Sequence, residues 1–505
     1  VSSNTDASES SGSSTGDAPR DLCPDGSEGR AYKVFAGGNS TCVLLCGRDG
    51  AVCWGDNASG QFGGGNEDIL TFSAGLGGRR LPPGYSEADP VFVVDGLATP
   101  LPIVDIALGD GLRCFLVDND GNSEEVVHCA GNPDANGAGS GIAAGGFVEM
   151  GLGASNKVIE LTTTDRRTCA LADSGQVQCW GWAGDQPISV DRILSPNAPL
   201  GHVSTASYYD PDENDFFLGN NETPGSAGVF PARSPFPTSI MVGAEHTCGV
   251  VPDNGVHCWG AGSNGVLGTG TQNLVAEFPV TANNGVLDSG DTLVQWEAGK
   301  FHSCAVVAPR GEENRLRCWG RGQLGVLGSG GTANANGGAS AASFVHPSFS
   351  DGQIPVEVRL GDENTCVRFD NGAIRCWGHA IEGRIGAADN DATDSAASPV
   401  YYDQPTAGAA IGDDTLAPVH DVPLGEEAIQ FALGGAHGCA LLVDGNVRCW
   451  GRSAELQTGY AFLATPRIEH PNVGGSRVID CPSPASAGNV PYSDWVVASN
   501  TECMP

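Results

Sequence analysis

The residues that could serve as a nucleophile or a general base do not form a catalytic set. Gly12-Ser13-Ser14-Thr15-Gly16 matches the Gly-x-Ser-x-Gly pattern of hydrolases, but that pattern needs a strand before the serine and a helix after it. This copy lies in a tract rich in Ser, Gly and Thr. The sequence contains no His-Glu-x-x-His and no P-loop. We therefore expect no catalytic residues and no enzyme activity.

Three histidines share one position of a repeat. His246, His302 and His437 each stand two residues before a cysteine. A histidine that recurs at one place in a hairpin is typical of a structural hydrogen bond rather than a general base. We therefore expect these side chains to support the fold.

Three acidic clusters offer the alternating oxygen ligands that Ca²⁺ prefers. They are Asp118-Asn119-Asp120-Gly121-Asn122, the segment 210–215 and the segment 389–394. The first coincides with a predicted turn, where Asp, Asn and Gly are common for conformational reasons. The candidate metal ligands are Asp210, Asp212, Asp389, Asp391 and Asp394. Calcium is the only cofactor that the sequence suggests.

Cysteines supply the strongest chemical pattern. Four pairs are separated by ten residues. Three of these pairs enclose a three-residue loop that ends in glycine, which matches a type I turn followed by a left-handed glycine. Cysteines that face each other across such a hairpin lie within disulfide distance. The predicted hairpin disulfides are Cys42–Cys53, Cys114–Cys129, Cys169–Cys179, Cys248–Cys258, Cys304–Cys318, Cys366–Cys376 and Cys439–Cys449.

The other four cysteines allow three connectivities, of which we favour Cys23–Cys46 with Cys481–Cys503. Disulfides form in oxidising compartments. The cysteine pattern therefore predicts a secreted protein, located extracellularly or at a cell surface.

A repeat carries these cysteine pairs. The second cysteine is followed by Trp-Gly in six copies, and Ala130 replaces the tryptophan in a seventh. Each copy has an apolar stretch, a cysteine, a turn that is usually Asp/Asn-Gly, and the second cysteine. The tryptophan positions, with Ala130 counted as the second, are 50 to 79 residues apart in the sequence, which accommodates a four-stranded propeller blade of about 50 residues plus insertions. The predicted fold is an all-β, seven-bladed propeller with long loop insertions and disulfide-bonded hairpins.

The repeat resembles that of the regulator of chromosome condensation family, especially its bacterial, cysteine-paired, secreted members. The resemblance covers roughly residues 31–460 and rests on His-Thr/Ser-Cys, Cys-Trp-Gly and a trailing Gly-x-Leu-Gly, as in Gly265-Val266-Leu267-Gly268 and Gly325-Val326-Leu327-Gly328. It implies a propeller that is commonly closed by strands from both chain ends within one blade. Repeats 2, 3 and 7 depart from this pattern, because they lack the trailing element.

The resemblance does not select a function. Nuclear members exchange nucleotide on a small GTPase and contact chromatin, whereas secreted members bind proteins, including β-lactamases. Sixty acidic residues against 25 basic ones give a net charge of −35, which repels nucleic acid and anionic lipid. We expect neither nucleic-acid binding nor membrane insertion.

The predicted domains are a low-complexity tail (1–22), the propeller (23–475) and a C-terminal disulfide-containing segment that packs on or closes the propeller (476–505). The chain starts at Val1 without the features of a signal peptide, which we interpret as a mature N-terminus. Asn39, Asn57 and Asn221 lie in glycosylation sequons, and the Ser/Thr-rich tail could also carry glycans.

Three functions fit these features. The first is a non-catalytic extracellular structural protein, a self-associating cell-surface or filament subunit whose N-terminal tail contacts a neighbouring subunit. The second is a secreted propeller that binds another extracellular protein, as an adhesin or an enzyme inhibitor. The third is a propeller hydrolase or lyase with carboxylates hidden in the insertions.

Overall fold

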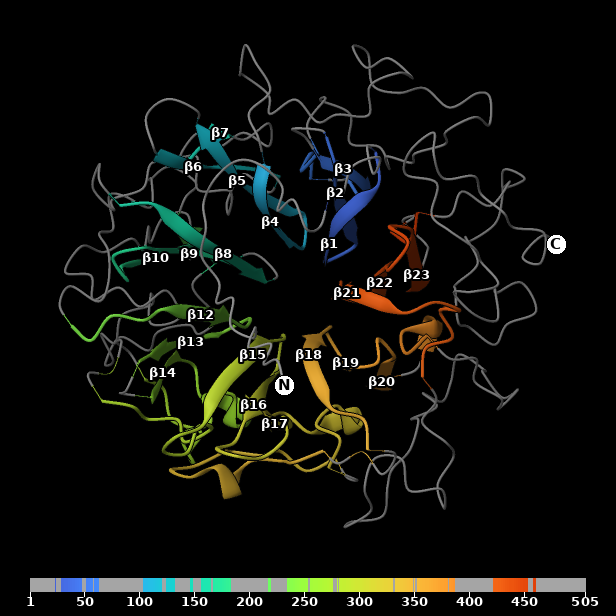
Figure 1. Ribbon diagram of the computed structural model, residues 1–505. Coiled ribbons are helices and arrows are strands. Elements are labelled where there is room, and N and C mark those ends of the chain that lie inside the picture. The colour runs from blue at the N-terminus through green and yellow to red at the C-terminus, as the bar shows by residue number, and fades with distance from the viewer. Residues whose placement is uncertain are drawn as a thin grey trace, which may run out of the picture.

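The computed structural model describes Cys23 and residues 29–47, 51–57, 59–62, 103–119, 124–131, 146–148, 156–164, 167–182, 217–218, 234–252, 255–275, 279, 281–329, 332–347, 349, 352–379, 381–386, 421–452 and 457–459. Within these residues the chain forms seven antiparallel sheets arranged as a ring (Figure 1). Two sheets have four strands and the others have three. The predicted seven-bladed propeller is confirmed.

Each blade begins with an inner strand and continues outward in chain order. The inner strands are β1 (Ala31–Gly37), β4 (Ile103–Gly109), β8 (Val158–Thr164), β12 (Ser239–Val242), β15 (Thr292–Ala298), β18 (Pro355–Leu360) and β21 (Ala428–Leu433). The second strands are β2 (Ser40–Leu45), β5 (Leu112–Asn119), β9 (Arg167–Ala172), β13 (His246–Val251), β16 (His302–Ala308), β19 (Asn364–Phe369) and β22 (His437–Leu442). The third strands are β3 (Ala51–Gly55), β6 (Glu124–Gly131), β10 (Val177–Trp182), β14 (Gly255–Gly260), β17 (Arg315–Gly320), β20 (Ile374–Gly378) and β23 (Val447–Gly451).

The second and third strands form the predicted disulfide-bonded hairpins. In all seven blades the two cysteines are direct cross-strand partners, for example Cys169 with Cys179 and Cys439 with Cys449, and their Cα atoms lie 4.0 to 4.1 Å apart. Gly175 has a φ of 77°, the left-handed turn conformation that the odd loop length predicts. Closing a loop of about ten residues contributes roughly 3 kcal/mol in the chain-entropy model.

The outer edge of the blades is made in several ways. β7 (Gly146–Phe147) and β11 (Phe217–Leu218) are short fourth strands of blades 2 and 3. In blades 4 and 5, single bridges from the insertions replace them, where Val275 pairs with Gly260 and Val345 pairs with Cys318. Insertions therefore cover sheet edges that would otherwise expose unpaired backbone groups.

The ring closes by packing blade 7 against blade 1. Each inner strand contacts the inner strands of its two neighbours, including β21 with β1 (Figure 1). The amide of Gln430 on β21 bonds both ways with Val34 on β1, accepting from its N–H at 3.1 Å and donating to its carbonyl at 3.2 Å. A backbone hydrogen bond adds to this contact, because the N–H of Gly435 in blade 7 donates to the carbonyl of Gly38 in blade 1 at 2.8 Å.

The propeller has two faces. The turns between inner and second strands lie at one end of the channel, and we call this end the turn face. The hairpin turns between second and third strands lie at the opposite end, beside the start of each inner strand, and we call it the hairpin face. No helix in the described part of the chain is long and apolar enough to cross a bilayer.

Candidate functional site

The predicted structural histidines join neighbouring blades. The Nε2 of His437 in blade 7 lies 2.8 Å from Oγ1 of Thr41 in blade 1, and Oγ1 of Thr41 donates to the carbonyl of Gln457 at 2.9 Å. Since the hydroxyl has one proton and donates it to the carbonyl, Nε2 of His437 must carry the proton that it shares with Thr41. The histidine is thereby fixed in one neutral tautomer.

The same histidine–hydroxyl hydrogen bond recurs between other neighbouring blades. His302 in blade 5 bonds Thr365 in blade 6 at 2.9 Å, and Thr365 donates to the carbonyl of Val326 at 2.8 Å. His246 in blade 4 bonds Ser303 in blade 5 at 3.0 Å. Burial lowers the pKa of His246, His302 and His437 to about 3, so all three are neutral and unsuited to proton transfer near pH 7.

The repeated tryptophans complete these connections. The indole N–H of Trp319 donates to the carbonyl of Val266 at 2.8 Å, and that of Trp377 donates to the carbonyl of Val326 at 2.9 Å. Each acceptor is the second residue of the preceding blade's Gly-x-Leu-Gly. Trp54 likewise donates to the carbonyl of Gln457 at 3.0 Å. The seventh repeat therefore supplies the equivalent carbonyl from Leu456-Gln457-Thr458-Gly459, although it lacks the Gly-x-Leu-Gly sequence.

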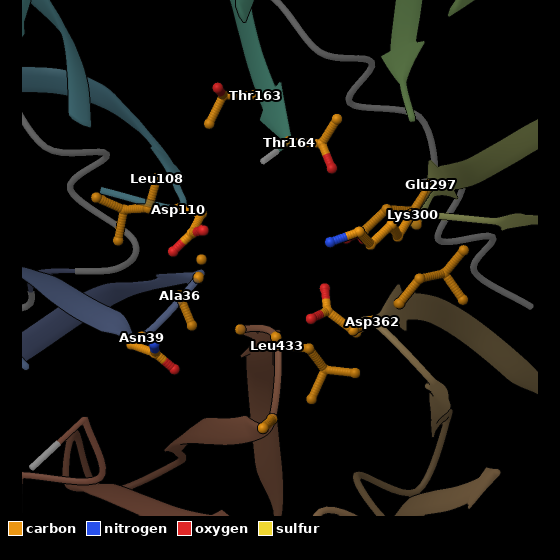
Figure 2. A pocket seen from close by; sticks show the side chains of 18 of the residues that line it. Ala36, Asn39, Leu108, Asp110, Thr163, Thr164, Glu297, Lys300, Asp362 and Leu433 are labelled. Atoms are coloured by element: carbon orange, nitrogen blue, oxygen red, sulfur yellow. The ribbon is translucent and has the colours of Figure 1, made fainter. Parts of the chain in front are cut away.

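The turn face contains a polar hollow at the mouth of the channel. Its cavity has a volume of about 240 Å³ and is walled by the ends of inner strands and by their turns. Figure 2 shows Asp110, Lys300 and Asp362 on separate blades around this hollow. Gly37 allows the close packing of blades 1 and 2, because a Cβ there would lie 1.9 Å from the carbonyl oxygen of Leu108. The lining includes the carboxylates of Asp110, Glu297 and Asp362 and the cationic groups of Lys300, Arg384 and Arg452.

An ionic network lines the channel below this hollow. Arg359 lies 2.8 Å from a carboxylate oxygen of Glu357 and 3.1 Å from one of Glu297. Burial raises the pKa of Glu297, and Arg359 opposes this shift. Burial also raises the pKa of Glu160 in blade 3 to about 8, while its carboxyl group accepts the N–H of Ile240 in blade 4 at 3.2 Å. These groups connect blades, so their perturbed pKa values reflect structural contacts.

The hairpin face exposes apolar side chains at one repeated position. Six inner strands contain a β-bulge near their start, where the register shifts by one residue. The inserted residue is apolar or aromatic in all six, and Thr238 occupies the corresponding place before β12. We call this set the apolar collar: Tyr32, Val104, Ile159, Thr238, Val294, Val356 and Ile429.

Three collar residues are among the most exposed large apolar residues of the described chain. Ile159 is 51% exposed, Val294 44% and Ile429 41%. Phe236 and Val443, the latter in the hairpin turn beside Ile429, are exposed on the same face. Beside the collar, a hollow of about 510 Å³ lies between the blade 5 hairpin and the segment that leads into β18. The exposed apolar side chains of the collar therefore lie at the same end of the propeller as this hollow.

Only some of the other predicted disulfide, calcium and glycan sites lie within the described residues. Cys23 bonds Cys46, whereas Cys481, Cys503 and the five candidate calcium ligands lie outside the described residues. Within the described part, no three His, Cys, Asp or Glu side chains are placed to hold a metal. Asn57 is buried, and its Oδ1 accepts the N–H of Phe62 at 2.8 Å, so it is inaccessible to a glycan in the folded protein. Asn39 is half-buried at the turn face, and Asn221 and the tail 1–22 are outside the described part.

Comparison with known proteins agrees with the blade geometry. The family model "Regulator of chromosome condensation (RCC1) repeat" matches residues 428–457. The mitochondrial RCC1 domain-containing protein RUG3 of Arabidopsis thaliana is 24% identical over 370 residues, which cover 66% of this chain and 78% of RUG3. The E3 ubiquitin-protein ligase HERC2 of Mus musculus is 24% identical over 321 residues, and the match covers 61% of this chain and 6% of HERC2.

Two solved structures share the fold. Prp20p of Saccharomyces cerevisiae is 16% identical with a TM-score of 0.56, over 86% of this chain and 84% of that chain. Human WBSCR16 is 16% identical with a TM-score of 0.53, over 81% of this chain and 90% of that chain. At this level of identity the likeness concerns the propeller architecture alone.

Proposed function

We propose that this chain, an RCC1-like β-propeller, is a non-catalytic extracellular protein that acts by binding another protein through its hairpin face. The observation that carries the proposal is the apolar collar. Ile159, Val294 and Ile429 occupy the same repeat position on one face and are 41 to 51% exposed. Leaving this apolar surface in contact with water costs free energy. Exposed apolar side chains that recur on one face support a role of that face in protein binding.

The eight disulfides place the folded protein in an oxidising environment. Secretion to the cell surface or medium is the setting that we propose. The propeller then serves as a rigid support, because the blades are joined through buried histidine, hydroxyl and indole hydrogen bonds. A rigid support limits the entropy that binding would otherwise cost.

Self-association remains the second candidate. It rests on the tail 1–22, which lies outside the described residues, and on the apolar collar, which a second copy would cover. The two candidates differ in what the collar contacts, so one set of variants addresses both.

The hydrolase or lyase alternative has one supporting feature, since Asp110, Glu297 and Asp362 line the polar hollow at the turn face. Asp110 and Asp362 are exposed. Burial raises the pKa of Glu297, but Glu297 pairs with Arg359 of the next blade, which is a structural contact. Protein binding is the better supported function.

The test compares three immobilised proteins: the wild type, the triple variant Ile159→Ser/Val294→Ser/Ile429→Ser, and the control Leu274→Ser. Leu274 is also 44% exposed but lies at the outer edge of blade 4, away from the collar. Each is exposed to extracellular proteins of the source organism, and sedimentation of the wild type alone measures self-association. We expect a defined protein to bind the wild type and the control and to lose at least tenfold in affinity for the triple variant. Equal binding by all three, or no bound protein and a monomeric wild type, contradicts the proposal.

A further inference from the structure

We infer that the hairpin face recognises a basic segment of a partner protein and that an apolar side chain of this segment enters the hollow between blades 5 and 6. The inference rests on the proposed function and specifies the chemistry of the partner. It follows from the floor of the hollow, its continuity with the collar and the charge of the surrounding turns.

The floor of the hollow is apolar and held in place. Pro347, Phe349, Ile354 and Pro355 line it. The Phe349 ring packs edge-on against Phe369 with ring centroids 4.8 Å apart and lies 6.3 Å from Trp377. A volume of about 510 Å³ is enough for a large aromatic or aliphatic side chain. The hollow is therefore formed before a partner arrives.

The hollow is continuous with the apolar collar. Pro355, which lines the hollow, directly precedes Val356 of the collar. On the other side, Thr292 and Leu293 pair with the last residues of β16, next to the hairpin turn that carries Glu312 and Glu313. Val294 follows them in the collar. A bound segment could thus contact the hollow and the exposed collar residue Val294 together.

The hairpin segments of the seven blades contain more acidic than basic residues in the sequence. The sequence between the second and third strands contains at least one acidic residue in every blade: Asp49, Asp120, Asp173, Asp253, Glu312, Glu313, Asp370 and Asp444. The same seven segments contain two basic residues, Arg48 and Arg310. At the hollow, Glu312 pairs with Arg315, and Glu313 is exposed beside it. An apolar centre with a charged rim is the usual organisation of a protein interface.

Charge selects among the possible occupants. Nucleic acid and anionic membranes are repelled by acidic turns. A second copy would bring a chain of net charge −35 against this rim. In a segment with Lys or Arg on both sides of an apolar side chain, the basic groups can pair with the acidic residues of the rim while the apolar side chain fills the hollow. The affinity of such a segment should fall as the salt concentration rises.

The test uses a phage-displayed library of random twelve-residue peptides selected on the intact, oxidised protein. We expect enriched peptides to carry Lys or Arg flanking Leu, Phe or Trp. Synthetic copies should bind Val294→Ser and Glu313→Lys at least fivefold more weakly than the wild type, and Leu274→Ser equally well. Both test positions are exposed, so thermal unfolding of the variants should match the wild type.

Enrichment of acidic or uncharged peptides overturns the inference, as does unchanged affinity in Val294→Ser and Glu313→Lys. Either result leaves the proposed function standing if the triple collar variant still loses its extracellular partner. If that partner also binds the triple variant normally, the proposed function fails as well.

Discussion

Closure of the ring predicts a measurable cost for the substitution Thr41→Val. Thr41 is fully buried between blades 1 and 7, and valine has nearly the same shape but no hydroxyl group. The substitution removes the bond to the carbonyl of Gln457 and leaves the Nε2–H of His437 without an acceptor. Trp54 still donates to that carbonyl, so the unpaired histidine N–H is the main penalty.

The magnitude follows from these contacts. A buried donor left without a partner costs about 1–3 kcal/mol, and the lost hydrogen bond contributes about 1 kcal/mol. We expect Thr41→Val to lower the free energy of unfolding by about 2–4 kcal/mol. The assay is urea unfolding of the oxidised protein followed by tryptophan fluorescence, since Trp54 is buried at this interface.

Thr365→Val is the matched control, because Thr365 makes the same contacts between blades 5 and 6. The two variants should lose similar stability. A cost below about 0.5 kcal/mol for Thr41→Val beside a full cost for Thr365→Val would show that blades 1 and 7 are not joined in this way.

Three further predictions concern the same interfaces. The low pKa of His246, His302 and His437 means that the unfolded chain binds protons below pH 6.5 while the folded chain does not until about pH 3, so stability should fall as pH drops through this window. Replacing His302 with Asn, the residue at the equivalent position 364, should flatten that dependence in urea titrations, and an unchanged slope would contradict the assignment. Glu160 has the opposite effect on the pH dependence, because its pKa in the folded protein is raised to about 8. The protonated carboxyl group stabilises the fold at low pH, and this contribution is lost as pH rises from about 4.5 to 8. Glu160→Gln should remove this loss, since Gln295 and Gln430 occupy equivalent positions. Gly434→Ala should destabilise the protein by about 3 kcal/mol or more, since a Cβ there would lie 2.1 Å from Cε1 of His437; a melting temperature equal to that of the wild type would show that the ring does not pack there.

The hairpins could be predicted from the sequence because cysteine spacing and turn glycines determine the register. Cys169 and Cys179 can face each other only if the loop between them is odd, and Gly175 supplies the conformation for that loop. The tryptophans were recognisable for a similar reason. The carbonyl of Gln457 in the seventh repeat, which accepts the indole N–H of Trp54, could not be predicted, because a backbone acceptor leaves no side-chain pattern in the sequence.

The apolar collar could not be predicted from the sequence. Ile159-Glu160-Leu161 and Ile429-Gln430-Phe431 read as ordinary strand alternation, with both apolar residues on the buried side. The bulge adds one residue to the inner strand, so the first apolar residue becomes exposed while the second remains in the core. This change depends on the register with the second strand, which only the structure provides. The relative positions of Asp110, Lys300 and Asp362 likewise depend on ring closure.

Site-specific photo-crosslinking tests most directly whether the hairpin face binds a protein. A photoreactive phenylalanine analogue is placed at Val294 in one protein and at Leu274 in another, because both positions are 44% exposed and differ in the face they occupy. Each protein is illuminated with the extracellular proteins of its source, and the adducts are identified by mass spectrometry. We predict a discrete adduct between another protein and position 294, with none at position 274. Adducts at position 274 alone, or equal labelling at both positions, would contradict the assignment of the hairpin face as the binding surface.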